Sequence, residues 1–544
     1  MLAMSGLSRR AAVLLAAIGA TAAFATPMVA RAADPPAPTA VPKATCGAGS
    51  HPETGIQGRV SPEDIASGRA AKGFTCNTEM VSHYGNTGGF RVHRYVDPSG
   101  HECAFYDTTL LFPTNLPQNL PELTGVWVLD MSDPKHPVHT DSLLTPAMQS
   151  PHESLSINQK RGLLAADMGS PLTAPGFVDI YDLKPDCRHP VLKSTLPVGV
   201  LGHEGAFSPD GNTFWVSSTA GHTLVAIDVS DPSVPKPLKI ITDYTGHGLN
   251  ASDDGNRLYY ALLNAGAGPP GLAILDVSEI QKRVPNPTIK EISRFSWPDI
   301  SIPQVPLPVT IGGHPYLVEI DEYAGGPYPS NAADASVGGA RIIDIGDEKK
   351  PKVVSNIKLE ANLPKFRALE QGDAAMNSSL QGYAGHYCNV PQRTDPGIVA
   401  CSFIGSGLRV FDIRDPLHPK EIAYFNAPAA AGRTGTTPSD YAMSAPTFVP
   451  SRGEIWYSDG NSGFYDVHVT NGVWPFSTGA ASVAAPPKVL GSTITAPAPK
   501  PATAPSRDLP ATGDTPWTPV GAAALALAGG CRMVRRASRR PRQV

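Results

Sequence analysis

L-V-A-I-D-V-S-D-P, residues 224–232, is the stretch that decides the fold, because versions of it recur along the whole chain. Each version is a short β-rich segment that ends in Asp and is followed by a turn, in most copies with Pro. Two close copies are V-W-V-L-D-M-S-D-P at 126–134 and L-R-V-F-D-I-R-D-P at 408–416. More divergent copies lie at 178–185, 272–278, 341–347 and 464–469. Repetition of one unit at this scale predicts a modular array.

The spacing of the repeated Asp gives the size of one unit. The aligned positions are Asp130, Asp182, Asp228, Asp276, Asp344 and Asp412, with His468 in the seventh place. Consecutive positions are 46 to 68 residues apart, which suits four strands joined by short turns. Asp-Gly pairs such as Asp210-Gly211 favour tight hairpins, and the Pro that follows the Asp in most copies forces a turn. We therefore predict an all-β, seven-bladed β-propeller with disordered Pro/Ala-rich flanks.

The copies V-A-I-D-V-S-D-P and R-V-F-D-I-R-D-P resemble the repeat of the LVIVD family, over roughly residues 75 to 470. This resemblance implies the same propeller fold. The family has no single established activity, so the resemblance leaves the function open.

The amino-terminal end has the pattern of an export signal. Arg9 and Arg10 precede an apolar run over 11–25, and Ala30-Arg31-Ala32 offers a small-residue cleavage site. We predict a signal peptide at 1–32 and a linker at 33–45. A membrane anchor helix is the alternative, but the apolar core is short and Pro27 interrupts the segment. The pattern does not decide between the general and the twin-arginine export route.

The carboxyl-terminal end is similar to the sorting signal of Gram-positive surface proteins. The sorting motif at 509–513 precedes an apolar segment at 520–530 and a basic tail at 531–544, and consists of Leu509, Pro510, Ala511, Thr512 and Gly513. The resemblance implies that a sortase cleaves after Thr512 and joins it to peptidoglycan. A plain tail anchor is the alternative, but eleven apolar residues are few beside the roughly 20 that span a bilayer.

These ends predict where the protein acts. An Ala/Pro/Thr-rich linker at 477–508 would be an extended tether, so the propeller at 46–476 would stand on the cell wall of a Gram-positive bacterium. The membrane would be a partner only transiently, through the apolar segment.

Charge narrows the class of partner. The chain has 44 Lys and Arg against 48 Asp and Glu, a net charge of −4. The predicted cleavages remove nine arginines and one acid, Asp514, so the mature protein would carry −12. An acidic surface gives no electrostatic basis for nucleic-acid binding. Neutral, cationic or metal-ion partners fit it better.

Six cysteines remain after removal of the tail that holds Cys531, an even number that suggests three disulfides in an exported protein. Cys388 and Cys401 flank a predicted hairpin, so we expect them to pair. For the other four we favour Cys46 with Cys76 and Cys103 with Cys187, although spacing alone leaves other pairings open.

Histidine recurs at the predicted start of the first, innermost strand of five units. These residues are His152, His203, His247, His314 and His386. In a propeller they would surround one mouth of the central channel, where converging imidazoles can bind a transition metal. Glu153 and Glu204 follow two of them and could be ligands or could orient the rings.

A packing role competes with the metal site, because a Gly-His pair at such a position can also hydrogen-bond across strands to blade Asp residues. A distant likeness to selenium-binding-protein propellers, which hold copper through histidines, adds a little to the metal hypothesis. The sequence does not identify the metal.

Other catalytic patterns are missing from the sequence, which has no G-x-S-x-G, P-loop or H-E-x-x-H motif. The acid pair Asp321-Glu322 is typical of a turn. Tyr323, Tyr328 and Tyr383 lie in long intervals between units and could line a pocket. Two functions therefore remain: a surface protein that binds an unidentified ligand without turnover, and a metal-dependent extracellular oxidase or hydrolase.

Overall fold

The computed structural model describes residues 39–108, 125–169, 175–263, 270–323, 337–377, 382–432 and 435–477, without the side chains of 432, 435 and 436. All of them belong to one compact unit. The predicted signal peptide, sorting motif, apolar segment, basic tail, Cys531 and Tyr328 lie outside the described residues and stay predictions.

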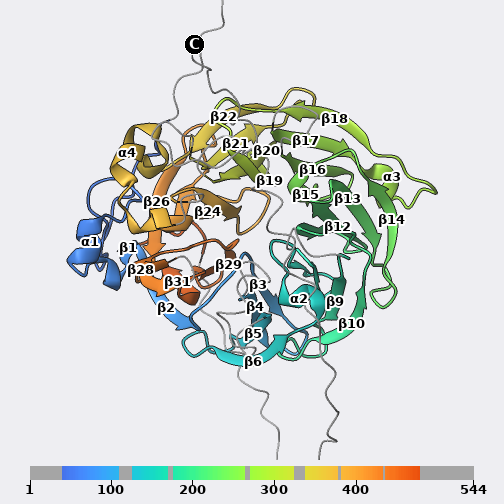
Figure 1. The fold of residues 1–544 in the computed structure, drawn as a ribbon, viewed down its shortest axis with the longest axis horizontal. Coiled ribbons are helices and arrows are strands. Elements are labelled where there is room, and N and C mark those ends of the chain that lie inside the picture. Colours follow the sequence, from blue (N-terminus) through green and yellow to red (C-terminus); the bar gives the residue numbers. More distant parts are fainter. Residues whose placement is uncertain are drawn as a thin grey trace, which may run out of the picture. The chain divides into compact units, whose positions relative to one another are not determined.

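Seven antiparallel sheets stand around a centre, so the predicted seven-bladed β-propeller is confirmed (Figure 1). The first three blades are β3 (Val92–Val96), β4 (Glu102–Asp107), β5 (Val126–Asp130) and β6 (Val138–Leu143); β7 (Ser156–Asn158), β8 (Leu163–Asp167), β9 (Val178–Asp182) and β10 (Val191–Leu196); and β11 (Glu204–Phe207), β12 (Thr213–Ser218), β13 (Thr223–Asp228) and β14 (Lys236–Ile241).

The fourth and fifth blades are β15 (Gly246–Ala251), β16 (Arg257–Leu262), β17 (Gly271–Asp276) and β18 (Lys290–Phe295); and β19 (Ile302–Ile311), β20 (His314–Glu322), β21 (Ala340–Asp344) and β22 (Lys352–Ile357). The sixth and seventh are β23 (Gly385–Asn389), β24 (Ile398–Phe403), β25 (Gly407–Asp412), β26 (Lys420–Asn426) and β1 (Phe74–Cys76); and β29 (Thr447–Val449), β30 (Glu454–Asp459), β31 (Gly463–Val469) and β2 (Thr78–Tyr84).

Short elements fill the loops. They are α1 (Pro62–Ala66), η1 (Ala70–Lys72), α2 (Pro146–Gln149), α3 (Ser278–Gln281), η3 (Glu360–Asn362), η4 (Pro364–Phe366), α4 (Arg367–Glu370), η5 (Ala374–Asn377), η6 (Ile404–Ser406), β27 (Ala430–Gly432) and β28 (Gly435–Ser439). In the described part of the chain, no helix is long and apolar enough to cross a membrane.

The repeated Asp ends the third strand in six blades and forms the turn after it. Its carboxylate accepts a hydrogen bond from the backbone N–H two residues later, at 2.8–3.1 Å, in Asp130, Asp182, Asp228, Asp276, Asp344 and Asp412. The carboxylate thus gives the turn N–H a hydrogen-bond acceptor after the strand, and its strand pairing, has ended. This explains why the repeat ends in Asp.

This bond gives a testable consequence at Asp228, which accepts from the Ser230 N–H at 3.0 Å. We expect Asp228→Ala to lower the free energy of unfolding by about 1 kcal/mol. Asp228→Asn keeps an acceptor oxygen in the same place and should be close to neutral. Urea unfolding of both variants checks this, and equal losses in the two would show that the charge, and not the hydrogen bond, matters.

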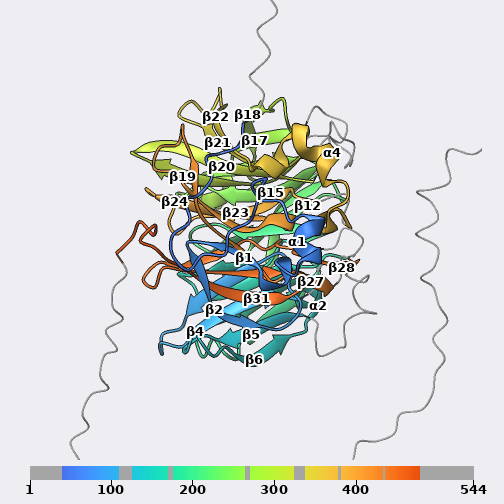
Figure 2. The same ribbon diagram turned by 90° about the vertical axis from the view of Figure 1, so that its left-hand side faces the viewer.

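The ring closes through the amino-terminal part of the chain. Strand β2 pairs with β31 and completes the seventh blade, and β1 adds a fifth strand to the sixth blade (Figure 2). The Cys46–Cys76 disulfide joins the preceding segment to the end of β1. The repeat pattern predicted the seventh unit, but it contains no hint that the outer strand of this unit comes from the other end of the chain.

Residues 39–45 were predicted as part of a linker, but they pack on the propeller. Val41 is buried and its N–H donates to the carbonyl of Lys358 at 2.8 Å. The N–H of Glu421 donates to the carbonyl of Pro42 at 3.1 Å. The packed domain therefore includes Val41 and Pro42 as well as the predicted 46–476.

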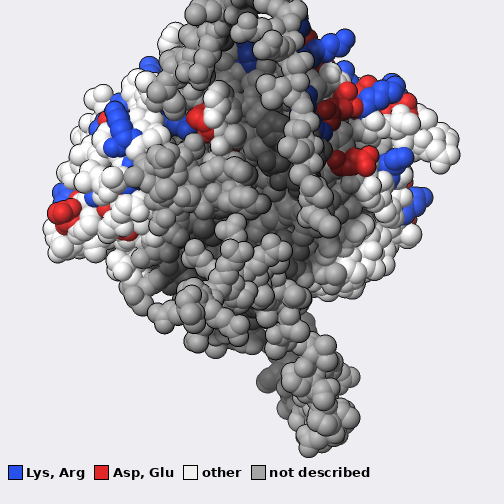
Figure 3. Space-filling model, turned by 45° about the horizontal axis from the view of Figure 1, so that its top comes forward, with Lys and Arg blue, Asp and Glu red and all other residues white. Residues whose placement is uncertain are grey.

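The hydrophobic core lies between neighbouring blades. Ile180 of the second blade packs in one cluster with Phe214 and Val216 of the third, and similar clusters join other blade pairs. The two remaining predicted disulfides are also present: Cys103–Cys187 links the first two blades, and Cys388–Cys401 links β23 to β24. Where Figure 3 shows described residues, at the two sides of the view, acidic and basic side chains lie next to one another.

Candidate functional site

Four of the five predicted histidines meet at the centre of the ring. His152, His203, His247 and His386 are between 0% and 7% exposed and come from the second, third, fourth and sixth blades. The ring centroids of His152 and His203 are 4.5 Å apart, and those of His203 and His247 are 5.0 Å apart. We call these four residues, with Glu153 and Glu322, the central cluster.

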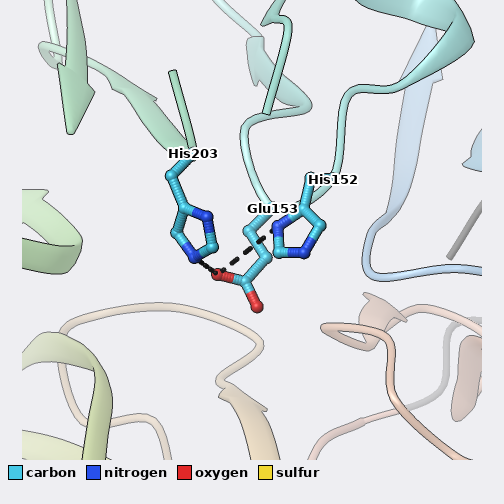
Figure 4. A group of neighbouring side chains, drawn as sticks. All are labelled: His152, Glu153 and His203. Carbon is cyan, nitrogen blue, oxygen red and sulfur yellow. Dashed lines mark ion pairs between the residues drawn. The ribbon is translucent and has the colours of Figure 1, made fainter. Parts of the chain in front are cut away.

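Glu153 lies in the middle of the central cluster, and His203 points at it (Figure 4). Its Oε2 atom is 3.1 Å from His203 Nε2 and 3.2 Å from His247 Nε2. Its Oε1 atom is 3.3 Å from His386 Nε2 and accepts a hydrogen bond from the buried amide of Gln304 at 2.6 Å. The carboxylate therefore faces imidazoles on both sides.

Glu322 completes the central cluster from the end of β20. Its two oxygens lie 3.5 Å from His247 Nε2 and 3.1 Å from His386 Nε2, and the residue is 4% exposed. Sequence reasoning missed it, because the Asp321-Glu322 pair was assigned to a turn. Its apolar neighbours in L-V-E-I-D-E, which alternate along a strand, were the signal that the pair ends a buried strand.

The glycine before a histidine makes the close approach to the centre possible. A Cβ on Gly202 would lie 1.9 Å from the Asp167 carboxylate, and one on Gly246 would lie 1.8 Å from the Tyr260 ring. His152 follows Pro151 instead and adopts a positive φ of 50°, which costs a non-glycine residue roughly 1–3 kcal/mol. Such strain is common at functional sites.

Two of the imidazoles have their tautomer fixed by the next blade. His247 Nδ1 lies 2.8 Å from the carbonyl of Pro303, and His386 Nδ1 lies 2.7 Å from the carbonyl of Met443. A carbonyl only accepts, so Nδ1 carries the proton in both rings. The Nε2 atoms then face Glu153 and Glu322. The expected cross-strand bonds therefore exist, but to backbone carbonyls and not to blade Asp residues.

Burial and opposite charge act together on the pKa values of the central cluster. Burial lowers the pKa of His247, but Glu153 and Glu322 raise it to about 10. Burial also lowers that of His386, and the same two carboxylates raise its pKa to about 9. Burial raises the pKa of Glu153, yet the surrounding imidazoles hold it well below its usual range. The pKa of His152 is well below its usual value, because of burial.

Glu204, the other predicted acid, lies beside the central cluster and pairs with a different group. It forms an ion pair with Arg91 and accepts a hydrogen bond from the Tyr387 hydroxyl at 2.8 Å. Burial raises the pKa of Glu204 to about 7, and Arg91 opposes that rise. Arg91 also donates to the carbonyl of Glu153 at 2.9 Å. Glu204 thus supports the backbone that carries Glu153.

His314 does not belong to the central cluster, so its predicted position was wrong. It begins β20, the second strand of its blade, where it is exposed and lies 2.7 Å from Asp344. Gly312 and Gly313 both have positive φ and form the hairpin turn before it. A Gly-Gly pair between two apolar runs is a hairpin signal, and it distinguishes this histidine from the other four.

The three tyrosines that were predicted as possible pocket residues lie in different environments. Tyr323 directly follows Glu322, and the charge of Glu322 raises its pKa well above the usual value. Tyr383 is buried, and its hydroxyl donates a hydrogen bond to Asp373 at 2.9 Å. It therefore supports a loop and does not line the mouth of the central channel. Tyr328 lies outside the described residues.

Two groups in the central cluster have the ligand spacing of a metal site. They are His152, Glu153 and His203, and Glu153, Glu322 and His386, and in each the ligand atoms lie within 4.8 Å of one another. A third group, Asp97, His101 and Asp186, has similar spacing. The Asp97 carboxylate accepts hydrogen bonds from the N–H groups of Ser99, His101 and Cys187 and contacts the His101 ring. These bonds stabilise a turn, which explains the spacing of the group without a metal.

Comparison with known proteins adds little beyond the fold. No family model matches the chain, so its membership in the LVIVD-repeat family stays a prediction, and no curated protein matches it either. Among solved structures, a candidate 6-phosphogluconolactonase from Bacteroides uniformis is 11% identical, covering 64% of this chain and 89% of that one, with a TM-score of 0.46.

Two further solved structures are similar at the same level. Hydrazine synthase from Kuenenia stuttgartiensis is 11% identical over 70% of this chain and 94% of that one, with a TM-score of 0.44. A protein from Lactobacillus plantarum is 12% identical over 62% of this chain and 85% of that one, with a TM-score of 0.42. At these scores the comparisons carry no argument about activity, and the fold assignment rests on the sheet topology.

Proposed function

We propose that this protein binds a divalent transition-metal ion in its central cluster and is a metal-dependent extracellular enzyme. The observation that carries the proposal is the orientation of His247 and His386. Their Nδ1 protons are bound to backbone carbonyls, and their Nε2 atoms face two carboxylates. A ligating histidine commonly donates its other N–H in this way.

The distances in the central cluster fit donors that share one metal ion. The contacts of Glu153 and Glu322 with the imidazoles are 3.1–3.5 Å long for His203, His247 and His386. Donors bound at about 2.0–2.2 Å to one ion are separated by roughly 3.0–3.6 Å. Among the described residues, the buried atoms Glu153 Oε2, His203 Nε2 and His386 Nε2 approach an oppositely charged partner at 3.1–3.3 Å, but without the geometry of a hydrogen bond. An ion between them would satisfy all three atoms.

A purely structural role for the histidines is the alternative. The Nδ1 bonds of His247 and His386 to the neighbouring blade favour it, because they hold blades together whether or not a metal binds. In that role the Nε2 atoms of His247 and His386 would be protonated and would form ion pairs with Glu153 and Glu322, as the raised pKa of each ring allows. The first function that the sequence left open, a surface protein that binds a ligand without turnover, would need only this structural role.

The chemistry available at such a centre is polarisation of a substrate oxygen or activation of a bound water. Both an oxidase and a hydrolase remain compatible with it. Nitrogen and carboxylate donors suit iron, manganese, zinc or copper.

We also propose that the enzyme acts at the cell surface, attached to peptidoglycan through Thr512. The order of the motif at 509–513, the apolar segment and the basic tail supports this proposal. Three disulfides, which persist in oxidising compartments, are consistent with export. Mass spectrometry of wall digests would test it: a peptide that ends at Thr512 with attached wall fragments supports it, and intact protein with its basic tail contradicts it.

Metal content tests the proposed function. We expect the exported, full-length protein, purified without a histidine tag, to retain a transition metal measured by elemental mass spectrometry. His203→Ala combined with His247→Ala should lose it, because two donors disappear, whereas His314→Ala should retain it. Folding is followed by circular dichroism. A folded wild-type protein that takes up no iron, manganese, zinc or copper would contradict the proposal and favour the structural role.

A further inference from the structure

The central cluster offers more donors than one catalytic ion uses. Six side chains converge there, four imidazoles and two carboxylates. A catalytic ion commonly takes three protein donors and keeps a position for water or substrate. One ion that took all six would have no such position.

The donors also divide into two sets that share one residue. One set is His152, His203 and Glu153, and the other is His386, Glu322 and Glu153. Within Glu153, the Oε2 atom contacts His203 and the Oε1 atom contacts His386. A carboxylate whose two oxygens serve different donor sets has the arrangement of a bridging ligand.

His247 can complete either set. Its Nε2 atom lies 3.2 Å from Glu153 Oε2 and 3.5 Å from Glu322 Oε1, between the two. When His247 is added, one set has four donors and the other has three. Each ion would then keep coordination positions open for a reacting molecule.

We propose that the centre is dinuclear: two divalent metal ions lie side by side, and Glu153 bridges them. The inference rests on the proposed metal-binding function and makes it more specific. Ions in two-metal sites are about 3.5–4 Å apart and hold the attacking and leaving oxygens of one substrate together. The substrate class that such a pair suits best is an ester, an amide or a phosphoester that is cleaved by water.

Gln304 has a role specific to this arrangement. Its amide nitrogen donates to Glu153 Oε1 at 2.6 Å, and the residue is fully buried. A carboxylate oxygen accepts two bonds, so Oε1 can accept from Gln304 and still bind an ion. Gln304 therefore positions the bridging carboxylate.

Titration of the metal-free, full-length protein with Co²⁺ tests the inference, because visible absorption reports ligation and elemental analysis after gel filtration reports tightly bound ions. We expect two equivalents in the wild type. Glu322→Ala and His152→Ala each remove a donor from one set only, and each should reduce tight binding to one equivalent. His314→Ala is the matched control and should bind two.

The outcomes separate the two proposals. In one outcome, the wild type binds one equivalent of Co²⁺, and one of the two variants that remove a donor from a single set binds the same amount. That result would overturn the dinuclear centre and leave the metal-binding function intact. No tightly bound ion would overturn both. Electron paramagnetic resonance of the Cu²⁺-loaded wild type gives a second measurement that needs no variant: bridged ions should lose signal intensity through spin coupling, and a full-intensity spectrum of isolated ions contradicts the bridge.

Discussion

Removal of the bound metal by a chelator should lower the free energy of unfolding by about 4 kcal/mol, for a free ion held at about 1,000 times its Kd. In the proposed centre, the metal would link the second, third, fourth and sixth blades through His152, His203, His247 and His386, so it would stabilise only the folded ring. With a typical unfolding entropy of about 2 cal/mol/K per residue, the Tm should fall by about 4 °C. Differential scanning calorimetry with and without chelator measures this.

The variant His203→Ala/His247→Ala is the control for this prediction. It lacks two donors, so its Tm should be lower than that of the wild type and should not respond to the chelator. An equal Tm for the wild type before and after chelation, with metal removal verified, would mean that no ion joins the blades.

Arg341→Met should lower the free energy of unfolding by about 3–5 kcal/mol, the typical cost of removing one partner from a buried ion pair. Arg341 is fully buried, forms ion pairs with Glu319 and Asp321, and lies over the Trp297 ring at 4.4 Å. Without the guanidinium, two carboxylates would stay buried without a counter-charge. Urea unfolding measures the loss.

The same change should also disturb the metal site, because Asp321 precedes Glu322 in β20. Asp321 accepts hydrogen bonds from Arg341 at 2.9 Å and from the Ser301 N–H at 3.1 Å, and so fixes the end of the strand. Arg341→Lys keeps the charge but loses the two-armed geometry, and we expect it to cost clearly less than Arg341→Met. A similar cost for both would show that geometry and not charge is essential at this position.

The fold was predictable from sequence to an unusual depth. The repeated phrase predicted the third strand of each of the seven blades; in six of them its Asp forms the same turn, and His468 stands in the seventh place. The pairs Asp210-Gly211 and Asp254-Gly255 predicted the first hairpins of the third and fourth blades. The contribution of β2 to the seventh blade was not predictable, since it pairs residues about 390 positions apart that share no repeat pattern.

The candidate site was predictable in part. The Gly-His pairs located His203, His247 and His386, because a glycine that permits close packing precedes each of them. The same Gly-His pattern led to the wrong position for His314, because Gly313 has a positive φ and forms a hairpin turn there. The place of Glu322 at the centre could not be assigned from its neighbours alone, because it ends β20, a strand of nine residues that pairs with the ten-residue β19. The first strands of the third and fourth blades, β11 and β15, have only four and six residues.

Anomalous diffraction from crystals of the metal-loaded protein, measured at the absorption edge of the bound metal, is the most direct test of the central claim. The account predicts the strongest peak inside the central cluster, about 2.0–2.2 Å from the Nε2 atoms of His247 and His386. A map without a peak there, or with its only peak at Asp97, His101 and Asp186, would contradict the proposed metal centre.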